Sequence, residues 1–180
     1  KIDYGAIETY NPYSAEKMTL IMAEPLINSY LKPEGEVTDG GELPEYVHGD
    51  KYVPYKIIDR MKGADLEGYH YKQLMQWIKP CEKIVDLAAP FVNSYAEAHP
   101  EKVFRATNSR EKFVEMESEA FRVILGDYVT TEDGTGIVHI APTFGADDAK
   151  VARDANIPSL YLINKKGETR PMVDLQGKYY

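Results

Sequence analysis

The chain has 180 residues, 43% of them hydrophobic and 28% charged, which is enough apolar sequence to bury one core without disulfides. Its net charge of -8 argues against a broad phosphate-binding surface, because such surfaces cluster Lys and Arg. Its single cysteine, Cys81, excludes an internal disulfide and a multi-cysteine zinc site. The sequence has neither an apolar run of about 20 residues nor a signal-peptide pattern, so we expect no membrane contact and a cytoplasmic location.

The first third of the chain predicts a strand, a helix and a loop. Residues 1–6 alternate apolar and polar side chains as in a strand hairpin, and the abrupt start indicates a fragment of a longer protein. Ser14 is a candidate helix N-cap, and apolar residues follow at helical spacing over 18–30, with a break or kink at Pro25. Residues 33–56 are rich in Gly, Pro and acidic residues, which predicts a surface excursion.

The middle of the chain predicts a strand, a turn and helical segments. Tyr55 to Lys62 has the composition of a strand, and glycines bracket a turn before a short strand at residues 69–71. Apolar residues lie at helical spacing over 83–99 with an interruption at Pro90, which predicts one bent helix or two short ones. Charges of both signs over 102–119 indicate a solvated face. We expect residues 76–118 to form a second surface excursion or insertion.

Residues 120–140 predict two strands joined by a tight turn. The alternation over Ala120 to Val129 is typical of a half-buried strand, and Glu132-Asp133-Gly134 is a hairpin signal. In the returning strand, 137–140, the period of two places Ile137 and His139 on one face. His139 therefore shares a face with apolar groups.

A helix and two more strands should follow. Gly145 allows a turn before Asp147 and Asp148 open a helix that runs to about Asn156. Residues 159–163 and 170–175 predict two strands, so the whole pattern is α+β with a mainly antiparallel sheet. An imidazole at a strand end, two carboxylates at a helix start and the ring of Phe144 then meet at one edge, as in many small pockets.

The spacing leaves simpler interpretations open. Asp at a helix start often only caps free N–H groups and complements the helix dipole, which would account for Asp147 and Asp148. A single strand histidine such as His139 is often a packed, hydrogen-bonded residue. Spacing alone therefore does not choose between a structural and a catalytic role.

Three stretches of the sequence resemble one family in the same order. DYVTTEDGTGIVHIAPTFGADD (Asp127 to Asp148) is similar to the signature of the editing domain, or connective peptide 1, of class I isoleucyl-tRNA synthetases. KGADLEGYHY (Lys62 to Tyr71) and TRPMVDLQGKYY (Thr169 to Tyr180) resemble the same family. His139 is followed, after one residue, by Ala141-Pro142, and this pattern favours the isoleucyl enzyme. A valyl or leucyl relative stays an alternative.

The resemblance implies a fold, an activity and partners. It implies that residues 1–180 form a single editing domain, a mainly antiparallel β-barrel core surrounded by helices. The implied activity is hydrolysis, by direct attack of water, of the ester in valine misattached to tRNA(Ile). A missing methylene is worth only about 1–3 kcal/mol, a range that isoleucyl-tRNA synthetases themselves illustrate, so a second site must do the sorting. The implied partners are the tRNA(Ile) 3′ end and the rest of the synthetase chain, with no DNA.

Roles follow from the resemblance residue by residue. Asp148 aligns with the aspartate that holds the α-ammonium group of the misattached amino acid, and His139 with the histidine at the pocket wall. Phe144 lines the amino-acid pocket, the turn Gly134-Thr135-Gly136 with Ile137 shapes its floor, and Asp147 is a helix-start residue. A threonine-rich strand that precedes this segment in the family is absent here, so the isolated fragment is expected to be weak or inactive.

Two other function classes remain open from the sequence. One is a metal-dependent hydrolase that uses His139, Asp147 and Asp148, an incomplete ligand set. The other is a non-catalytic insertion that is structural or binds the tRNA end. The resemblance implies no cofactor or metal in this domain; in the full-length enzyme it implies ATP, with zinc an open alternative.

Overall fold

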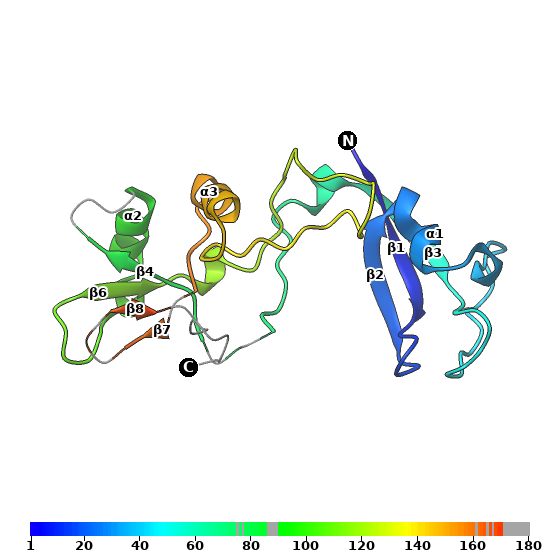
Figure 1. The fold of residues 1–180 in the computed structure, drawn as a ribbon, viewed down its shortest axis with the longest axis horizontal. Helices are drawn as coiled ribbons and strands as arrows, with labels where there is room; N and C mark the ends of the chain where they lie inside the picture. The colour runs from blue at the N-terminus through cyan, green and yellow to red at the C-terminus, as the bar shows by residue number, and fades with distance from the viewer. Residues whose placement is uncertain are drawn as a thin grey trace. The chain divides into compact units, whose positions relative to one another are not determined.

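The computed structural model describes residues 1–74, 76, 78–85, 90–160, 162–164, 166 and 168–170. These residues fall into two compact units, each of which takes two parts of the chain. Unit 1 consists of Lys1–Tyr69 and Val123–His139, and unit 2 of His70–Arg122 and Ile140–Tyr180. Each unit has a small antiparallel sheet and its own buried core, so the fold is α+β, as the pattern predicted (Figure 1).

Unit 1 is built on a three-stranded antiparallel sheet of order β2-β1-β3. Its strands are β1 (Asp3–Tyr10), β2 (Lys17–Ala23) and β3 (Lys56–Lys62), and its short helical elements are η1 (Glu24–Leu26), α1 (Ile27–Tyr30), η2 (Pro33–Gly35) and η3 (Gly63–Leu66). The buried side chains of β1, including Tyr4 and Ile7, pack against β2, α1 and Tyr55. The strands predicted at residues 1–6 and 55–62 are confirmed.

The helix predicted after Ser14 is wrong. Strand β2 occupies this stretch and pairs with β1 over the register Tyr4↔Ala23 to Tyr10↔Lys17, and only the four residues of α1 are α-helical. The apolar residues of 18–22 fit a period of two as well as a helical one, and pairing with β1 satisfies the backbone groups that an isolated helix start would leave free. Pro25 lies at the start of η1, where its missing N–H costs little.

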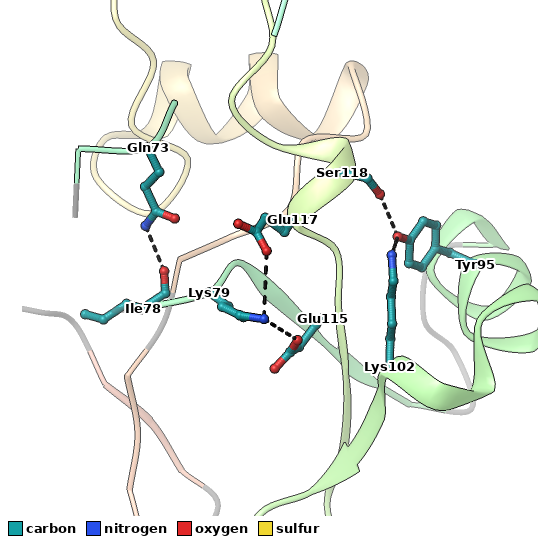
Figure 2. Close-up of polar contacts among 8 residues, drawn as sticks. All are labelled: Gln73, Ile78, Lys79, Tyr95, Lys102, Glu115, Glu117 and Ser118. Carbon is teal, nitrogen blue, oxygen red and sulfur yellow. Dashed lines mark hydrogen bonds and ion pairs between the residues drawn. The ribbon is translucent and has the colours of Figure 1, made fainter. Parts of the chain in front are cut away.

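Unit 2 is built on a second antiparallel sheet, of order β4-β6-β5. Its elements are β4 (Cys81–Ile84), α2 (Pro90–Ala98), η4 (Pro100–Lys102), β5 (Val103–Arg105), β6 (Lys112–Glu115), η5 (Glu117–Glu119), α3 (Ala146–Asp154), β7 (Leu162–Ile163) and β8 (Thr169–Arg170). Val92 and Tyr95 of α2 pack on Val114 and Met116. Figure 2 shows the Tyr95 hydroxyl bonded to Ser118 and Lys102.

The elements predicted for unit 2 are only partly confirmed by the structure. The helical prediction over 83–99 is wrong for residues 83 and 84, which belong to β4. It is confirmed from Pro90, where α2 begins. The two late strands, predicted at 159–163 and 170–175, are present as the two-residue strands β7 and β8. Residues 86–89, 161 and 171–175 lie outside the described residues. The helix predicted at 147–156 is confirmed as α3.

The two strands predicted in 120–140 are not formed. Residues 120–129 make a single bridge, His70↔Arg122, because Phe121 has a φ of 49°, which interrupts an extended strand. Residues 137–140 are not a strand either, so the hairpin predicted at Glu132-Asp133-Gly134 is only a turn. In the part of the chain that the structure describes, neither three-stranded sheet closes into the barrel that the resemblance implied. No helix of that part could cross a membrane.

Candidate functional site

The residues named by the resemblance divide between the two units at His139. Unit 1 carries Gly134, Thr135, Gly136, Ile137 and His139. Unit 2 carries Phe144, Asp147 and Asp148. The structure therefore divides the predicted set into two halves, one in each unit, and each half has its own local geometry.

The turn at Gly134–Gly136 is fixed to the sheet of unit 1 by two hydrogen bonds. The Ala23 N–H at the end of β2 donates to the Thr135 carbonyl at 2.9 Å. The buried Tyr4 hydroxyl of β1 donates to the Gly136 carbonyl at 2.5 Å. Burial raises the pKa of Tyr4, which keeps this hydroxyl protonated as a donor. The turn is thus positioned by residues more than 110 positions earlier in the chain.

The two glycines of this turn meet different requirements. Both have a positive φ, 68° at Gly134 and 74° at Gly136, which favours glycine. A Cβ at Gly136 would lie 2.6 Å from the Cβ of Ala23, whereas a Cβ at Gly134 would meet open space. Gly136 is therefore required both by its backbone conformation and by the close approach of β2.

The residues after the turn are exposed. Ile137 and Val138 keep about half of their surface exposed, 50% and 51%, and His139 is also exposed. The prediction that His139 shares the face of a strand with apolar groups is wrong, because residues 137–140 do not form a strand. Its imidazole is instead open to solvent or to a bound group.

The start of α3 is closed by a side-chain carboxylate. Gly145, with a φ of 111°, precedes the helix, and the Phe144 N–H donates to the Ala141 carbonyl at 2.9 Å. The Ala141 N–H donates to Asp148 Oδ2 at 3.0 Å. Asp148 therefore ties the turn at residues 141–144 to the first turn of the helix.

Asp147 and Phe144, the neighbours of Asp148 in the predicted site, are more exposed than Asp148. Asp148 is half-buried, whereas Asp147 is exposed and its carboxylate accepts no hydrogen bond from the described residues. Both aspartates lie in the first turn of α3, where a negative charge is stabilised by the helix dipole. The Phe144 ring is 84% exposed and projects from the turn.

The other end of α3 is anchored to the rest of unit 2. Arg122 Nη2 donates to the Ala155 carbonyl at 2.6 Å. The Ser159 N–H donates to Glu82 Oε1 at 2.7 Å, and the Cys81 N–H to the Ser159 carbonyl at 3.1 Å. Cys81 is buried, which raises the pKa of its thiol to about 12 and makes it a poor nucleophile.

Unit 2 also contains a hollow that the sequence did not predict. Its volume is about 280 Å³, and it is lined by His70, Tyr71, Lys72, Gln73, Gln76, Glu117, Ala120 and Phe121. The Tyr71 N–H donates to the Phe121 carbonyl at 2.8 Å, which holds the two walls together. The alternation of aromatic and polar residues in YHYKQ, at 69–73, was the available signal, interpreted there only as a short strand.

A second hollow, of about 350 Å³, lies in unit 1 within the predicted excursion at residues 33–56. Four of its lining residues are acidic: Glu34, Glu36, Glu45 and Asp50. Among the residues that the structure describes, no three His, Cys, Asp or Glu side chains gather closely enough to hold a metal ion.

Comparison with known proteins gives the family context. No protein-family profile matches the chain. It is 49% identical over 180 residues to the isoleucine-tRNA ligase of Bacteroides thetaiotaomicron. The chain is homologous to a segment of isoleucine-tRNA ligases. The ligase of Bacteroides fragilis is 47% identical over 180 residues, and that of Porphyromonas gingivalis 41% over 181.

The homologous segment is a small part of each ligase. The whole chain is matched in all three cases, yet it spans only 12–13% of the length of these isoleucine-tRNA ligases. The similarity therefore establishes a relationship to this part of an aminoacyl-tRNA synthetase, which is a protein of translation.

Proposed function

We propose that this segment is the editing domain of an isoleucyl-tRNA synthetase, with residues 1–180 as one functional domain. It hydrolyses the ester of valine misattached to tRNA(Ile), in a cytoplasmic enzyme. Two observations support the proposal: homology to isoleucine-tRNA ligases over the whole chain, and the resemblance of Asp127 to Asp148 to the editing signature. The rest of the ligase supplies the synthetic site and its ATP.

The observation that carries the proposal is the position of Asp148. One of its oxygens accepts the Ala141 N–H, which fixes the carboxylate at the start of α3. Its other oxygen accepts no hydrogen bond from the described residues, so it is available to the α-ammonium group of an aminoacyl ester. Such a charge-assisted contact would hold the ester carbon beside an attacking water.

The other residues of the signature have supporting roles in this proposal. Exposed His139 bonds the ribose or the water, and exposed Phe144 forms part of the wall around the amino-acid side chain. The turn Gly134–Gly136, fixed by Tyr4 and Ala23, and Ile137 form the floor. Asp147 stabilises the helix start. Water attacks directly, so no Ser, Cys or Lys nucleophile and no cofactor is needed.

The decisive experiment measures deacylation by a full-length ligase that carries this segment. Asp148→Asn keeps an oxygen that can accept the Ala141 N–H but removes the charge that binds the ammonium group. We expect hydrolysis of valyl-tRNA(Ile) to fall at least about tenfold, in line with the loss of one charge-assisted bond. Formation of isoleucyl-tRNA(Ile) should be unchanged, which shows that the variant is folded.

Asp147→Asn is the matched control, because it removes the same charge from the same helix turn. Its rate of hydrolysis should stay within about twofold of the unchanged enzyme, since an exposed helix-start charge contributes only a few tenths of a kcal/mol. If Asp148→Asn also clears valyl-tRNA(Ile) at the unchanged rate, the segment is a non-catalytic insertion. If the enzyme clears a different misattached amino acid, a valyl or leucyl relationship replaces the isoleucyl one.

A further inference from the structure

The hollow of unit 2 lined by residues 70–73, 76, 117, 120 and 121 has the composition of a small polar binding site. At about 280 Å³ it is near the lower limit of ligand pockets, roughly 300–1,000 Å³, and so fits one ring system with its substituents. Its walls carry two aromatic rings, two glutamines, a histidine and a lysine. None of these residues has a role in the editing proposal above.

Gln73 gives the first sign of a ligand. Its side chain is buried, with 8% of the residue exposed, and its Nε2 donates to the Ile78 carbonyl at 2.7 Å. Figure 2 shows the amide nitrogen bonded to the Ile78 carbonyl, with the amide oxygen to its side. That oxygen accepts no hydrogen bond from the residues that the structure describes. It is not one of the buried atoms without a partner, so it is accessible and can accept a hydrogen bond from a group bound in the hollow.

The aromatic residues give the second sign. Tyr71 stands edge-on to Phe121, with ring centroids 5.9 Å apart and planes at 78°, which fixes the orientation of the tyrosine ring. Tyr71 is nevertheless 53% exposed, so part of its ring is open for stacking. Burial of the rest raises the pKa of Tyr71, so the hydroxyl stays neutral at physiological pH.

The charges around the hollow permit an anionic ligand of limited size. Lys72 is exposed and lines the hollow. The one acidic residue of the lining, Glu117, lies 3.9 Å from Lys79 Nζ, which is also paired with Glu115 at 3.4 Å (Figure 2). The chain as a whole carries a net charge of -8, so it would repel a long phosphate backbone. A single nucleotide is compatible with both facts.

We infer that this hollow binds one unpaired nucleotide from the 3′ end of the tRNA. The base stacks on Tyr71, an exocyclic amino group of adenine or cytosine donates to Gln73 Oε1, and Lys72 contacts the adjoining phosphate. The inference rests on the proposed function, because it assigns a second contact to the RNA whose ester Asp148 would hold.

The hollow and the start of α3 belong to the same unit and are joined through Arg122. Arg122, next to Phe121 of the hollow, donates to the Ala155 carbonyl at the end of α3. The rise of 1.5 Å per residue places Asp148 about 10 Å from Ala155 along the helix axis. A nucleotide held in the hollow could therefore restrict the position of the terminal ester relative to Asp148.

The test compares two forms of tRNA(Ile) bound to the full-length ligase, one intact and one without its unpaired 3′-terminal nucleotides. Replacing the stacking ring by Tyr71→Leu should raise the Kd of the intact tRNA about 5- to 150-fold, the range for loss of one stacked base. The Kd of the shortened tRNA should not change. A variant that merely distorts the fold would weaken both, so the difference between the two tRNAs is the diagnostic readout.

Tyr69→Leu is the matched control, because Tyr69 is 56% exposed and does not line the hollow. It should leave both Kd values unchanged, and Tyr71→Phe, which keeps the ring, should bind as the unchanged enzyme does. Equal effects of Tyr71→Leu on the two tRNAs, or no effect on either, would overturn the inference.

The same proteins separate this inference from the proposed function. If Asp148→Asn clears valyl-tRNA(Ile) normally while Tyr71→Leu still distinguishes the two tRNAs, editing fails and the nucleotide site stands. If Asp148→Asn is slow and Tyr71→Leu has no effect on binding, the editing proposal stands and the nucleotide site is withdrawn.

Discussion

The two units hold their halves of the signature by different means. In unit 1 the turn at Gly134–Gly136 is fixed through backbone groups, with Tyr4 and Ala23 as partners and a glycine where β2 approaches. In unit 2 the start of α3 is fixed by one side chain, Asp148, that can also serve chemistry. The comparison teaches that a substitution in the first half should act on stability, and one in the second half chiefly on function.

The largest effect is expected from Gly136→Ala. The new Cβ would clash with Ala23 and the residue would keep a φ near 74°, so we expect a loss of about 2–4 kcal/mol from unit 1. Hydrogen exchange at the Ala23 amide should accelerate accordingly. Gly134→Ala shares the positive φ without the clash and should cost only about 1 kcal/mol. Equal exchange in the two variants would contradict the packing argument.

The next effect concerns Cys81 in the core of unit 2. Its folded thiol pKa of about 12 lies above the ordinary value of 9.0, so burial stabilises the neutral form. That contribution is fully present below pH 9 and is lost as the pH rises toward 12. We expect the free energy of unfolding of unit 2 to fall by about 2 kcal/mol between pH 8 and 11.

Cys81→Ala is the control for this titration, because the same Lys and Tyr groups titrate in both proteins. Denaturant unfolding of the two proteins at pH 8 and pH 11 isolates the contribution of the thiol. Identical pH dependence would mean that the thiol is already exposed in the folded protein. Gly136→Ala should leave the reaction of Cys81 with a thiol reagent unchanged, since the two residues belong to different units.

The smallest effect on stability is expected at Asp148. Asp148→Ala removes the acceptor of the Ala141 N–H and a first-turn charge of α3, which together contribute about 1 kcal/mol at this half-buried position. Asp148→Asn should cost less, because the amide oxygen can still accept. Thermal unfolding of unit 2 compares the two, and a loss above about 3 kcal/mol would make Asp148 a structural residue.

Local signals in the sequence were reliable where the chain stabilises itself. Gly145 and the two aspartates that follow it predicted the start of α3 within a residue, and the composition of 55–62 predicted β3. The apolar spacing of residues 18–30 predicted a helix, although residues 18–22 also fit the period of two of strand β2. What decided between them was β1, a partner that no local window contains.

For the candidate site, the structure tests the predicted local geometry of the residues and not their roles. The resemblance named His139 and Asp148, yet the strand predicted to carry His139 is not formed. The backbone of this stretch bonds to β2 at Thr135, before the predicted strand. The hollow lined by residues 70–73 and 76 was not predicted because its second wall, at 117, 120 and 121, is far away in sequence, and because no local pattern shows that Gln73 is buried.

The Tyr4–Gly136 hydrogen bond spans 132 residues, which has a consequence for synthesis of the chain. At roughly 5–20 residues per second, a ribosome needs roughly 7–26 s to add Gly136 after Tyr4. During that interval the first sheet has no partner for the Tyr4 hydroxyl or for the Ala23 amide, while the first part of unit 2 is already emerging. Synthesis of unit 1 thus begins first and ends late. For most of the time needed to make this segment, the Tyr4 hydroxyl and the Ala23 amide of the nascent chain lack their partners in the turn at Gly134–Gly136.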